Sequence, residues 1–243
     1  MENGKIRMNQ NVLDKGYIRL VNSWGTELDI ANSARVSYDK ESRLREDGSL
    51  TLHDQKLVKF LVQHKHDSTL RHCGFTFEVY APLMVARQWY KHAVASTHVE
   101  DQLGWNESSR RYITENEEFY IPKGDQWRSK PENSKQGSGP TLSSDIGGYY
   151  TNKLYDTAVA SAKLYEQAME AGIAPEQARL FLPAYSMYVR WRWTTSLNSA
   201  LHFLSLRMGH GAQSEIVDYA EAVNTLVKEK FPITTAAWEE FRV

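Results

Sequence analysis

Residues 185–195, YSMYVRWRWTT, carry the pattern that decides the fold, because large apolar side chains alternate there with polar or basic ones. One side of this segment holds Tyr185, Met187, Val189, Trp191 and Trp193. Successive side chains of a strand point to opposite faces, so the alternation predicts a strand with one buried face. Residues 74–80, GFTFEVY, alternate in the same way, and YIRLV at 17–21 predicts a third strand. Such alternation favours an antiparallel sheet, since parallel strands are usually apolar on both faces.

Helical patterns fill most of the remaining chain. Local sequence predicts helices at 54–64, 83–89, 149–171, 175–181, 199–208 and 212–230. The helix at 149–171 is expected to bury Leu154, Thr157, Ala158, Ser161, Leu164, Tyr165 and Ala168, and the last one Ile216, Tyr219, Ala220, Val223 and Val227. Residues 129–148 are rich in Ser, Gly, Pro and Lys and predict a loop. We therefore expect one α+β domain over residues 1–243, with an antiparallel or mixed sheet packed against long helices.

The composition limits the functional classes that fit. The chain has 29 Lys and Arg against 30 Asp and Glu, a net charge of -1, whereas a dedicated nucleic-acid or membrane-surface binder is usually basic. The single cysteine, Cys73, excludes an intramolecular disulfide and a cysteine-based zinc site. No stretch approaches the roughly 20 apolar residues of a membrane span, and the N-terminus lacks the apolar stretch of a signal peptide. We expect a cytoplasmic protein that binds neither nucleic acid nor membrane.

The densest polar segment is 87–112, RQWYKHAVASTHVEDQLGWNESSRRY. The chain has no GxGxxG loop and no P-loop, so a bound nucleotide would be held by side chains. The run NESSRR at 106–111 suits phosphate binding, because Arg supplies charged bidentate donors and Ser supplies neutral ones. The alternative interpretation is a solvated, charged loop.

Further clusters each leave more than one interpretation open. The histidines of 64–66 with His72 suit a metal site, but their spacing matches no metal signature, so ligand-binding or ordinary structural histidines are the alternatives and no metal is predicted. Residues 207–215, RMGHGAQSE, form either an anion site at a helix N-terminus or an ordinary turn. Arg179 binds an anion or forms a surface salt bridge. The basic and aromatic residues of 188–193 suit base stacking, but the neutral net charge favours sheet packing.

Taken together, these segments resemble the flavin-dependent thymidylate synthases (the ThyX family) over about residues 17–231. The resemblance rests on the order and spacing of short motifs: ARVSY at 34–38, HDS at 66–68, FTF at 75–77, AP at 81–82, VARQW at 85–89, NESSRRY at 106–112, FYIP at 119–122, AR at 178–179, LP at 182–183, FL at 203–204, LR at 206–207, AQ at 212–213 and EI at 215–216.

The chain departs from the family signature, which usually reads RHRxxSxNExSxR in one run. Here Lys91 replaces the first Arg and Ala93 the third, and residues 97–105 are inserted before the NExSxR part. Lys supplies charge without a bidentate fork, and Ala supplies no polar group. The family commonly has a His at the position of Gly211, whereas His210 lies one place away.

The resemblance implies reductive methylation of dUMP to dTMP. The methylene would come from methylenetetrahydrofolate and the hydride from FADH2, which NADPH reduces. It also implies a homotetramer whose active sites are shared between subunits. The family needs no covalent enzyme nucleophile, so Cys73, although beside His72, is not expected to act as one. The alternatives are a flavin-dependent oxidoreductase of the same fold without thymidylate chemistry, which the changes at Lys91 and Ala93 allow, or a nucleotide- or nucleic-acid-binding module.

The resemblance also assigns site residues by position. Arg207 would be the catalytic residue that binds the uracil ring and favours ionisation of its ring nitrogen. The dUMP site would comprise Gln88, Trp89, Tyr90, Lys91, Glu107, Ser108, Ser109, Arg110, Arg111, Arg179 and Arg207. The FAD site would comprise His66, Ser68, Lys91, His92, Ala93, Glu107, Ser196, Leu197, Asn198 and His202.

Overall fold

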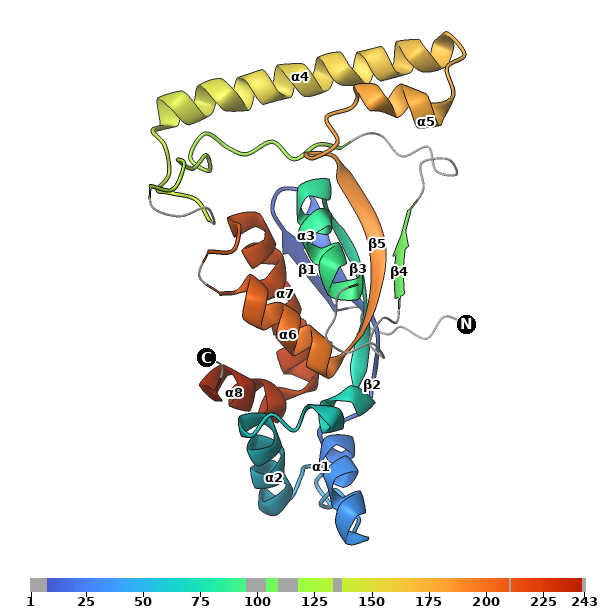
Figure 1. Cartoon of the computed structure of the whole chain (residues 1–243), viewed down its shortest axis with the longest axis vertical. Coiled ribbons are helices and arrows are strands. Elements are labelled where there is room, and N and C mark those ends of the chain that lie inside the picture. Colours follow the sequence, from blue (N-terminus) through green and yellow to red (C-terminus); the bar gives the residue numbers. More distant parts are fainter. Residues whose placement is uncertain (1–7, 95–103, 109–117, 133–136, 210, 242–243) are drawn as a thin grey trace.

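The computed structural model describes residues 8–94, 104–108, 118–132, 137–209 and 211–241. Its centre is a sheet with strand order β1-β2-β3-β5-β4, in which every neighbouring pair is antiparallel (Figure 1). The strands are β1 (Asn9–Val12), β2 (Gly16–Trp24), β3 (Gly74–Pro82), β4 (Gly104–Glu107) and β5 (Tyr188–Ser196). The predicted antiparallel α+β fold is confirmed. The edge strands β1 and β4 lie outside the sequence predictions, because four residues carry too little periodicity to detect.

The prediction of a single buried face is wrong for β3, because both of its faces are covered. Phe75 and Phe77 are fully buried in the main core. On the opposite face Glu78 is also buried, since the Tyr17 hydroxyl donates to it at 2.9 Å and Arg19 forms an ion pair with it. The sequence of β3 thus shows one polar face, and side chains of the neighbouring strand β2 cover that face.

Three helices cover one face of the sheet: α3 (Leu83–Val94), α6 (Leu197–Arg207) and α7 (Ser214–Lys230) (Figure 1). All the residues expected to point inward from α7 are buried, namely Ile216, Tyr219, Ala220, Val223 and Val227. The core between α3, α6 and β5 is aromatic. Trp89 stacks on Phe203 with ring centroids 4.4 Å apart and meets Trp191 and Trp193 edge-on at 5.5 and 5.3 Å. These stacked and edge-to-face arrangements are the favourable ones for aromatic rings.

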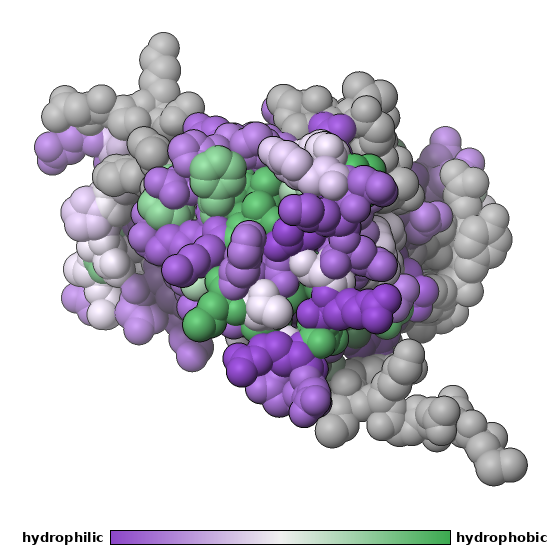
Figure 2. Space-filling view, turned by 90° about the horizontal axis from the view of Figure 1, so that it is seen from below, coloured by the Kyte–Doolittle hydropathy of each residue, from purple (hydrophilic) through white to green (hydrophobic). Residues whose placement is uncertain are grey.

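A second group of helices lies at one end of the sheet: α1 (Glu27–Arg35), η1 (Val36–Tyr38), α2 (Leu52–Gln63), η2 (Asp67–His72) and α8 (Pro232–Phe241). Figure 2 views the molecule from this end, where hydrophilic residues surround separate apolar patches. The predictions miss α8, since Pro232 suggests only the end of α7. Pro232 instead occupies the first turn of α8, where its missing N–H is harmless. The buried carboxylate of Glu27 accepts the backbone N–H groups of Ile233 and Thr234 at 2.8 and 3.0 Å and so caps this helix.

A long helical arm extends beside this body, formed by α4 (Ser144–Glu170), α5 (Pro175–Ala178) and η4 (Arg179–Phe181) (Figure 1). The prediction that a loop runs to residue 148 is wrong, because α4 already begins at Ser144. Gly147 and Gly148 lie within the first turns of this helix, and such a glycine pair is typical of a loop. A Cβ at Gly147 would lie 1.8 Å from the carbonyl oxygen of Gly124, so glycine is required there by close backbone packing and not by a loop.

The surface of α4 is unusually apolar. The stripe expected to be buried is only partly so: Ala158 and Ala168 are buried, whereas Leu164 is 48% exposed. Other apolar side chains of the helix are exposed as well, namely Ile146, Tyr149, Tyr150, Tyr155, Val159 and Met169. Within the described residues, no helix is both long and apolar enough to cross a membrane.

Candidate active site

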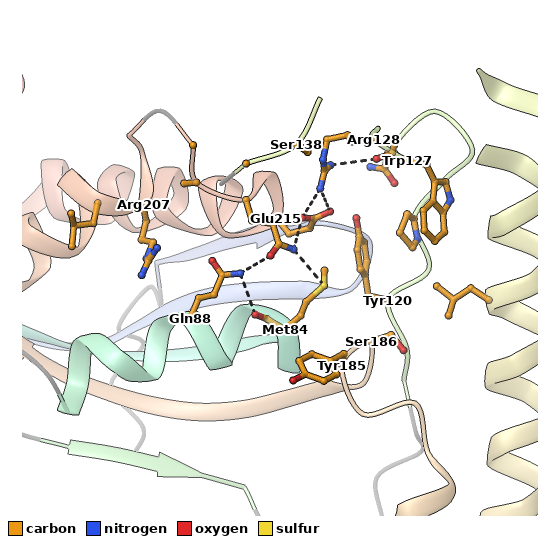
Figure 3. A pocket seen from close by; sticks show the side chains of 18 residues that line it. Met84, Gln88, Tyr120, Trp127, Arg128, Ser138, Tyr185, Ser186, Arg207 and Glu215 are labelled. Carbon is orange, nitrogen blue, oxygen red and sulfur yellow. Dashed lines mark hydrogen bonds and ion pairs between the residues drawn. The ribbon is translucent and has the colours of Figure 1, made fainter. Parts of the chain in front are cut away.

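An open cavity of about 990 Å3 lies between the body and the arm (Figure 3). The body contributes side chains from α3, from the end of α6, from the start of α7 and from the connection between these two helices, including Met84, Gln88, Arg207, Gln213 and Glu215. The arm and nearby loops contribute Tyr120, Trp127, Arg128, Ser138, Leu154 and Tyr185. The cavity therefore combines a charged and amide-bearing wall with an aromatic one, which suits a ligand with both polar and ring components.

Helix α3 sets the polar wall because residues four apart share a helix face. Met84 and Gln88 point into the cavity in this way. Their neighbour Trp89 faces the opposite way and is fully buried in the aromatic core. Lys91, one turn after Gln88, is exposed.

Arg207 occupies the last turn of α6 and lines the cavity. Its Nε donates a hydrogen bond to Nε2 of His92 at 3.0 Å. Burial, followed by the positive charge of Arg207 and the proximity of His202, lowers the pKa of His92 to about 4. His92 is therefore neutral near pH 7, which is the state that can accept this bond. Burial also lowers the pKa of Arg207, but a guanidinium stays protonated in proteins.

A continuous chain of hydrogen bonds crosses the floor of the cavity (Figure 3). Arg128 forms an ion pair with Glu215, its Nη2 lying 2.7 and 2.8 Å from the two carboxylate oxygens. Gln213 Nε2 donates to Glu215 at 2.8 Å, and Gln88 Nε2 donates to Gln213 Oε1 at 2.5 Å. Burial on its own raises the pKa of Glu215, but the hydrogen bonds from Arg128 and Gln213 outweigh it and hold the pKa below its usual value. Glu215 is thus an anion inside the protein.

A smaller hollow of about 250 Å3 lies between η2, α6 and α8. Asn198 and His202 of the predicted FAD set line it, together with Asp67. Ser196 and Leu197 from the same set are buried at the start of α6, where the Ser196 hydroxyl accepts the backbone N–H of Ser199 and caps the helix. Of the described residues, no three from His, Cys, Asp and Glu cluster in a way that would hold a metal ion.

The remaining predicted residues are spread around the chain. His66 and Ser68 are exposed near the small hollow, and His66 stacks on Phe60 with ring centroids 5.8 Å apart. Arg179 is exposed on the arm. Tyr90 is 43% exposed. Ser109, Arg110, Arg111 and His210 lie outside the described residues, as does the side chain of Ala93. One chain therefore brings Gln88 and Arg207 into a single cavity, while the roles predicted for the others stay predictions.

The C-terminal end of the inserted segment is part of the sheet. Gly104 and Trp105, its last two residues, begin β4 and pair with Thr194 and Trp193 of β5. Trp105 stacks on Trp191 with ring centroids 4.8 Å apart. After Asn106 come Glu107 and Ser108 of the predicted site, and the Ser108 N–H donates to the Arg190 carbonyl at 2.8 Å. The insertion thus leads directly into residues 106–108 of the predicted phosphate-binding run, which are held at the edge of the sheet.

Sequence reasoning misses several residues of the cavity, most clearly Tyr120, Arg128, Gln213 and Glu215. Gln213 and Glu215 stand in motifs that support the family resemblance, but no role attaches to them there. Arg128 directly precedes a segment interpreted only as a loop. The signal that identifies them is a side-chain contact between distant parts of the chain, which spacing along the sequence does not reveal.

Cys73 is placed where a nucleophile would not work. It is fully buried, and burial raises its pKa to about 12, with the negative charges of Asp29 and Glu27 acting in the same direction. We expect Cys73→Ser to keep turnover within about threefold of wild type, since only a weak 3.5 Å bond from the thiol to the Thr26 carbonyl changes. Steady-state kinetics and iodoacetamide labelling of the native protein at pH 8 test this. An inactive variant that still binds its cofactor would restore the thiol as a candidate nucleophile.

The low pKa of His92 predicts a pH dependence of folding. The pKa of His92 is 6.5 in an unfolded chain and about 4 in the folded one. Between pH 6.5 and pH 4, the unfolded chain therefore binds a proton at His92 that the folded chain does not. Stability should therefore rise with pH across this window and be fully present above it. We expect His92→Gln, which retains an acceptor for Arg207, to reduce the stability difference between pH 5 and pH 7.5 by about 1 kcal/mol in urea unfolding. His53→Gln on the exposed side of α2 is the control, and equal pH slopes for all three proteins would contradict the assignment.

Comparison with known proteins places these features in one family. The family described as "Thymidylate synthase complementing protein" matches residues 19–233. A flavin-dependent thymidylate synthase of Thermus thermophilus is 37% identical over 230 residues, which cover 94% of this chain and 77% of that protein. The enzyme of the same name from Thermosipho melanesiensis is 35% identical over 234 residues, with 96% and 95% coverage.

A solved structure supports the same assignment. The UMP/dUMP methylase PolB from Streptomyces cacaoi, bound with 5-Br dUMP, has a TM-score of 0.78 and 26% identity, covering 96% of this chain and 98% of that one. A second structure of PolB, bound with 5-Br UMP, matches equally well, with a TM-score of 0.78. With the antiparallel sheet, the aromatic core and a cavity holding Gln88 and Arg207, the chain belongs to the family of flavin-dependent thymidylate synthases.

Proposed function

We propose that the protein is an FAD-dependent thymidylate synthase that methylates dUMP to dTMP in the cavity between the body and the arm. The observation that carries this proposal is that Arg207 and Gln88 line one cavity, within a chain similar over nearly its whole length to enzymes of that name. As in the family, methylenetetrahydrofolate is proposed as the carbon donor and NADPH as the reductant.

In this proposal, residues of the cavity activate uracil without an enzyme thiol. A pyrimidine becomes nucleophilic at C5 when negative charge develops on the ring. The Arg207 guanidinium, partly desolvated and held at Nε by neutral His92, provides a fixed positive charge for that purpose. Gln88 on the same wall orients the nucleotide. Reduced FAD, when bound, supplies the hydride.

The small hollow fits part of a flavin. Asn198 and His202 line it and offer hydrogen-bonding groups, and Ser68 and His66 are exposed beside it on η2 and just before it. These residues would hold the cofactor. At about 250 Å3, however, the hollow is smaller than the roughly 300–1,000 Å3 of typical cofactor sites. We therefore infer that other segments or another subunit complete the FAD site.

A tritium-release assay tests the reaction. The purified protein should bind FAD and show flavin absorbance, and it should release tritium from dUMP labelled at C5 when methylenetetrahydrofolate and NADPH are supplied. NADPH oxidation without tritium release would indicate a flavin oxidoreductase instead. UMP is tested as a second substrate in the same assay, because PolB is named for both nucleotides. Failure to bind FAD at saturating concentration would refute the proposal.

We further propose that the protein is a homotetramer whose contacts include the arm. The exposed apolar side chains of α4, among them Tyr155 at 59% and Val159 at 53%, form a surface that a monomer rarely leaves open to water. The double change Tyr155→Glu and Val159→Glu should shift the particle mass toward dimers or monomers in light scattering. Lys56→Glu is the control, because it also places a glutamate on an exposed helix surface, that of α2, and it should leave the particle mass unchanged. A monomeric wild-type protein would contradict this assembly.

A further inference from the structure

We propose that the Arg128–Glu215 ion pair positions the amide of Gln88 through Gln213, so that Gln88 presents its carbonyl oxygen to a hydrogen-bond donor of the bound nucleotide. We call Arg128, Glu215, Gln213 and Gln88 the amide relay. The proposal rests on the proposed function of the cavity as a dUMP site. Arg128, Glu215 and Gln213 are positioning residues in it, because they act through Gln88.

The relay is anchored by charge. Glu215 is 5% exposed in the first turn of α7, and Arg128 reaches it from the loop beside the arm. An ionised carboxylate accepts hydrogen bonds and donates none. A buried carboxylate with a guanidinium on both oxygens therefore offers a fixed acceptor to the next residue in the relay.

This acceptor decides which way the amides point. A glutamine amide has a donor end and an acceptor end that differ little in shape. Because Glu215 accepts only, Gln213 must turn its Nε2 toward it, and that Nε2 also lies 3.5 Å from the sulfur of Met84. The Oε1 of Gln213 then points to Gln88, and because this oxygen only accepts, Gln88 must donate to it through its own Nε2.

The same logic leaves one end of Gln88 for the ligand. Its Nε2 donates to Gln213 at 2.5 Å and to the backbone carbonyl of Met84 at 3.4 Å, so both N–H groups are engaged. Its Oε1 has no partner among the described residues and points toward the Arg207 side of the cavity (Figure 3). Gln88 thus offers an acceptor beside the donors of Arg207. Either the ring N–H or a sugar hydroxyl of the nucleotide supplies the matching donor.

Gln213→Met tests the relay, since it removes both amide bonds while leaving the ion pair in place. The readout is the dUMP affinity of the FAD-loaded full-length protein by calorimetry. We expect the Kd for dUMP to rise about tenfold, as for loss of one ligand hydrogen bond. Gln88→Met should have the same effect, and the double variant should be no weaker than either single one, because both act on one contact. FAD absorbance should stay unchanged.

The charge at the start of the relay is tested by Glu215→Gln, with Glu229→Gln on the exposed side of α7 as its control. We expect the first change to weaken dUMP binding about tenfold and the control to leave it unchanged. Removing one partner of a buried ion pair also endangers folding. If Glu215→Gln does not fold, Gln213→Met decides. A folded Gln213→Met protein with wild-type dUMP affinity would overturn the proposal, even if its melting temperature had fallen.

Two dUMP analogues identify which group of the nucleotide donates a hydrogen bond to Gln88. An N3-methylated dUMP lacks the ring N–H, and 2′,3′-dideoxy-UMP lacks the sugar hydroxyl. Wild type should lose affinity for one of them, and Gln213→Met should lose less for that same analogue. Equal sensitivity of both proteins to both analogues would overturn the relay. A wild-type protein that binds FAD but not dUMP would instead refute the proposed function itself.

Discussion

Arg207→Ala is expected to abolish turnover, lowering kcat by about 10²–10³-fold, while FAD binding is largely preserved. Arg207 is the cationic side chain that α6 places at the polar wall of the cavity beside Gln88. Removing a charge-stabilising donor from a preorganised site typically costs a rate factor of that size. Of the residues proposed for FAD, Asn198 and His202 line the other hollow, between η2 and α6.

The measurement combines tritium release with flavin titration. FAD affinity of Arg207→Ala should stay within a few-fold of wild type, followed by the change in flavin absorbance. Arg43→Ala, an exposed arginine on the loop before α2, serves as the control and should behave as wild type. Equal losses of FAD binding and turnover would argue that Arg207 supports the cofactor site and not the uracil ring.

The second large effect is on stability. Trp89→Ala should lower the free energy of unfolding by about 3–5 kcal/mol, the usual cost of truncating a large buried aromatic. Trp89 is fully buried and contacts Phe203, Trp191 and Trp193 through stacked or edge-on rings. Its place in the family motif suggests a substrate contact, but in this chain its side chain fills the core beneath the cavity.

Tyr90→Ala is the matched control, because Tyr90 is the next residue on α3 and is 43% exposed. We expect it to change stability by less than about 1 kcal/mol. Urea unfolding of both variants at pH 7.5 measures the difference. A Trp89→Ala protein with wild-type stability and weakened dUMP binding would contradict the core assignment and favour direct substrate contact.

Elements that bury a complete apolar stripe are predictable from sequence. In α7 the pattern is contained within 17 residues, and all five inward positions are buried. Elements completed by distant partners are not. The cap of α8 comes from Glu27, 206 residues before Ile233, and the polar face of β3 is covered by side chains of β2. No local pattern contains those partners.

The residues of the candidate site also fall into those that the sequence predicts and those that it does not. Gln88 and Arg207 follow from motifs with recognisable spacing. The relay behind Gln88 does not, because Gln88 and Gln213 are separated by 125 residues and Arg128 and Glu215 by 87. Its members acquire a role only when α3, α7 and the loop beside the arm meet. Leu164 of α4 is a further case, since the sequence places it on the stripe expected to be buried and the structure leaves it 48% exposed.

The aromatic core around Trp89 gives the protein an internal optical reporter. Among the described residues, the indole N–H groups of Trp89 and Trp191 find no hydrogen-bond partner, so both rings emit from apolar surroundings, at shorter wavelength than a hydrated indole. Indole emission overlaps flavin absorption, so excitation energy passes from these rings to a flavin bound nearby. We therefore expect the ultraviolet fluorescence of the unlabelled chain to change both when its aromatic core unfolds and when the cofactor binds.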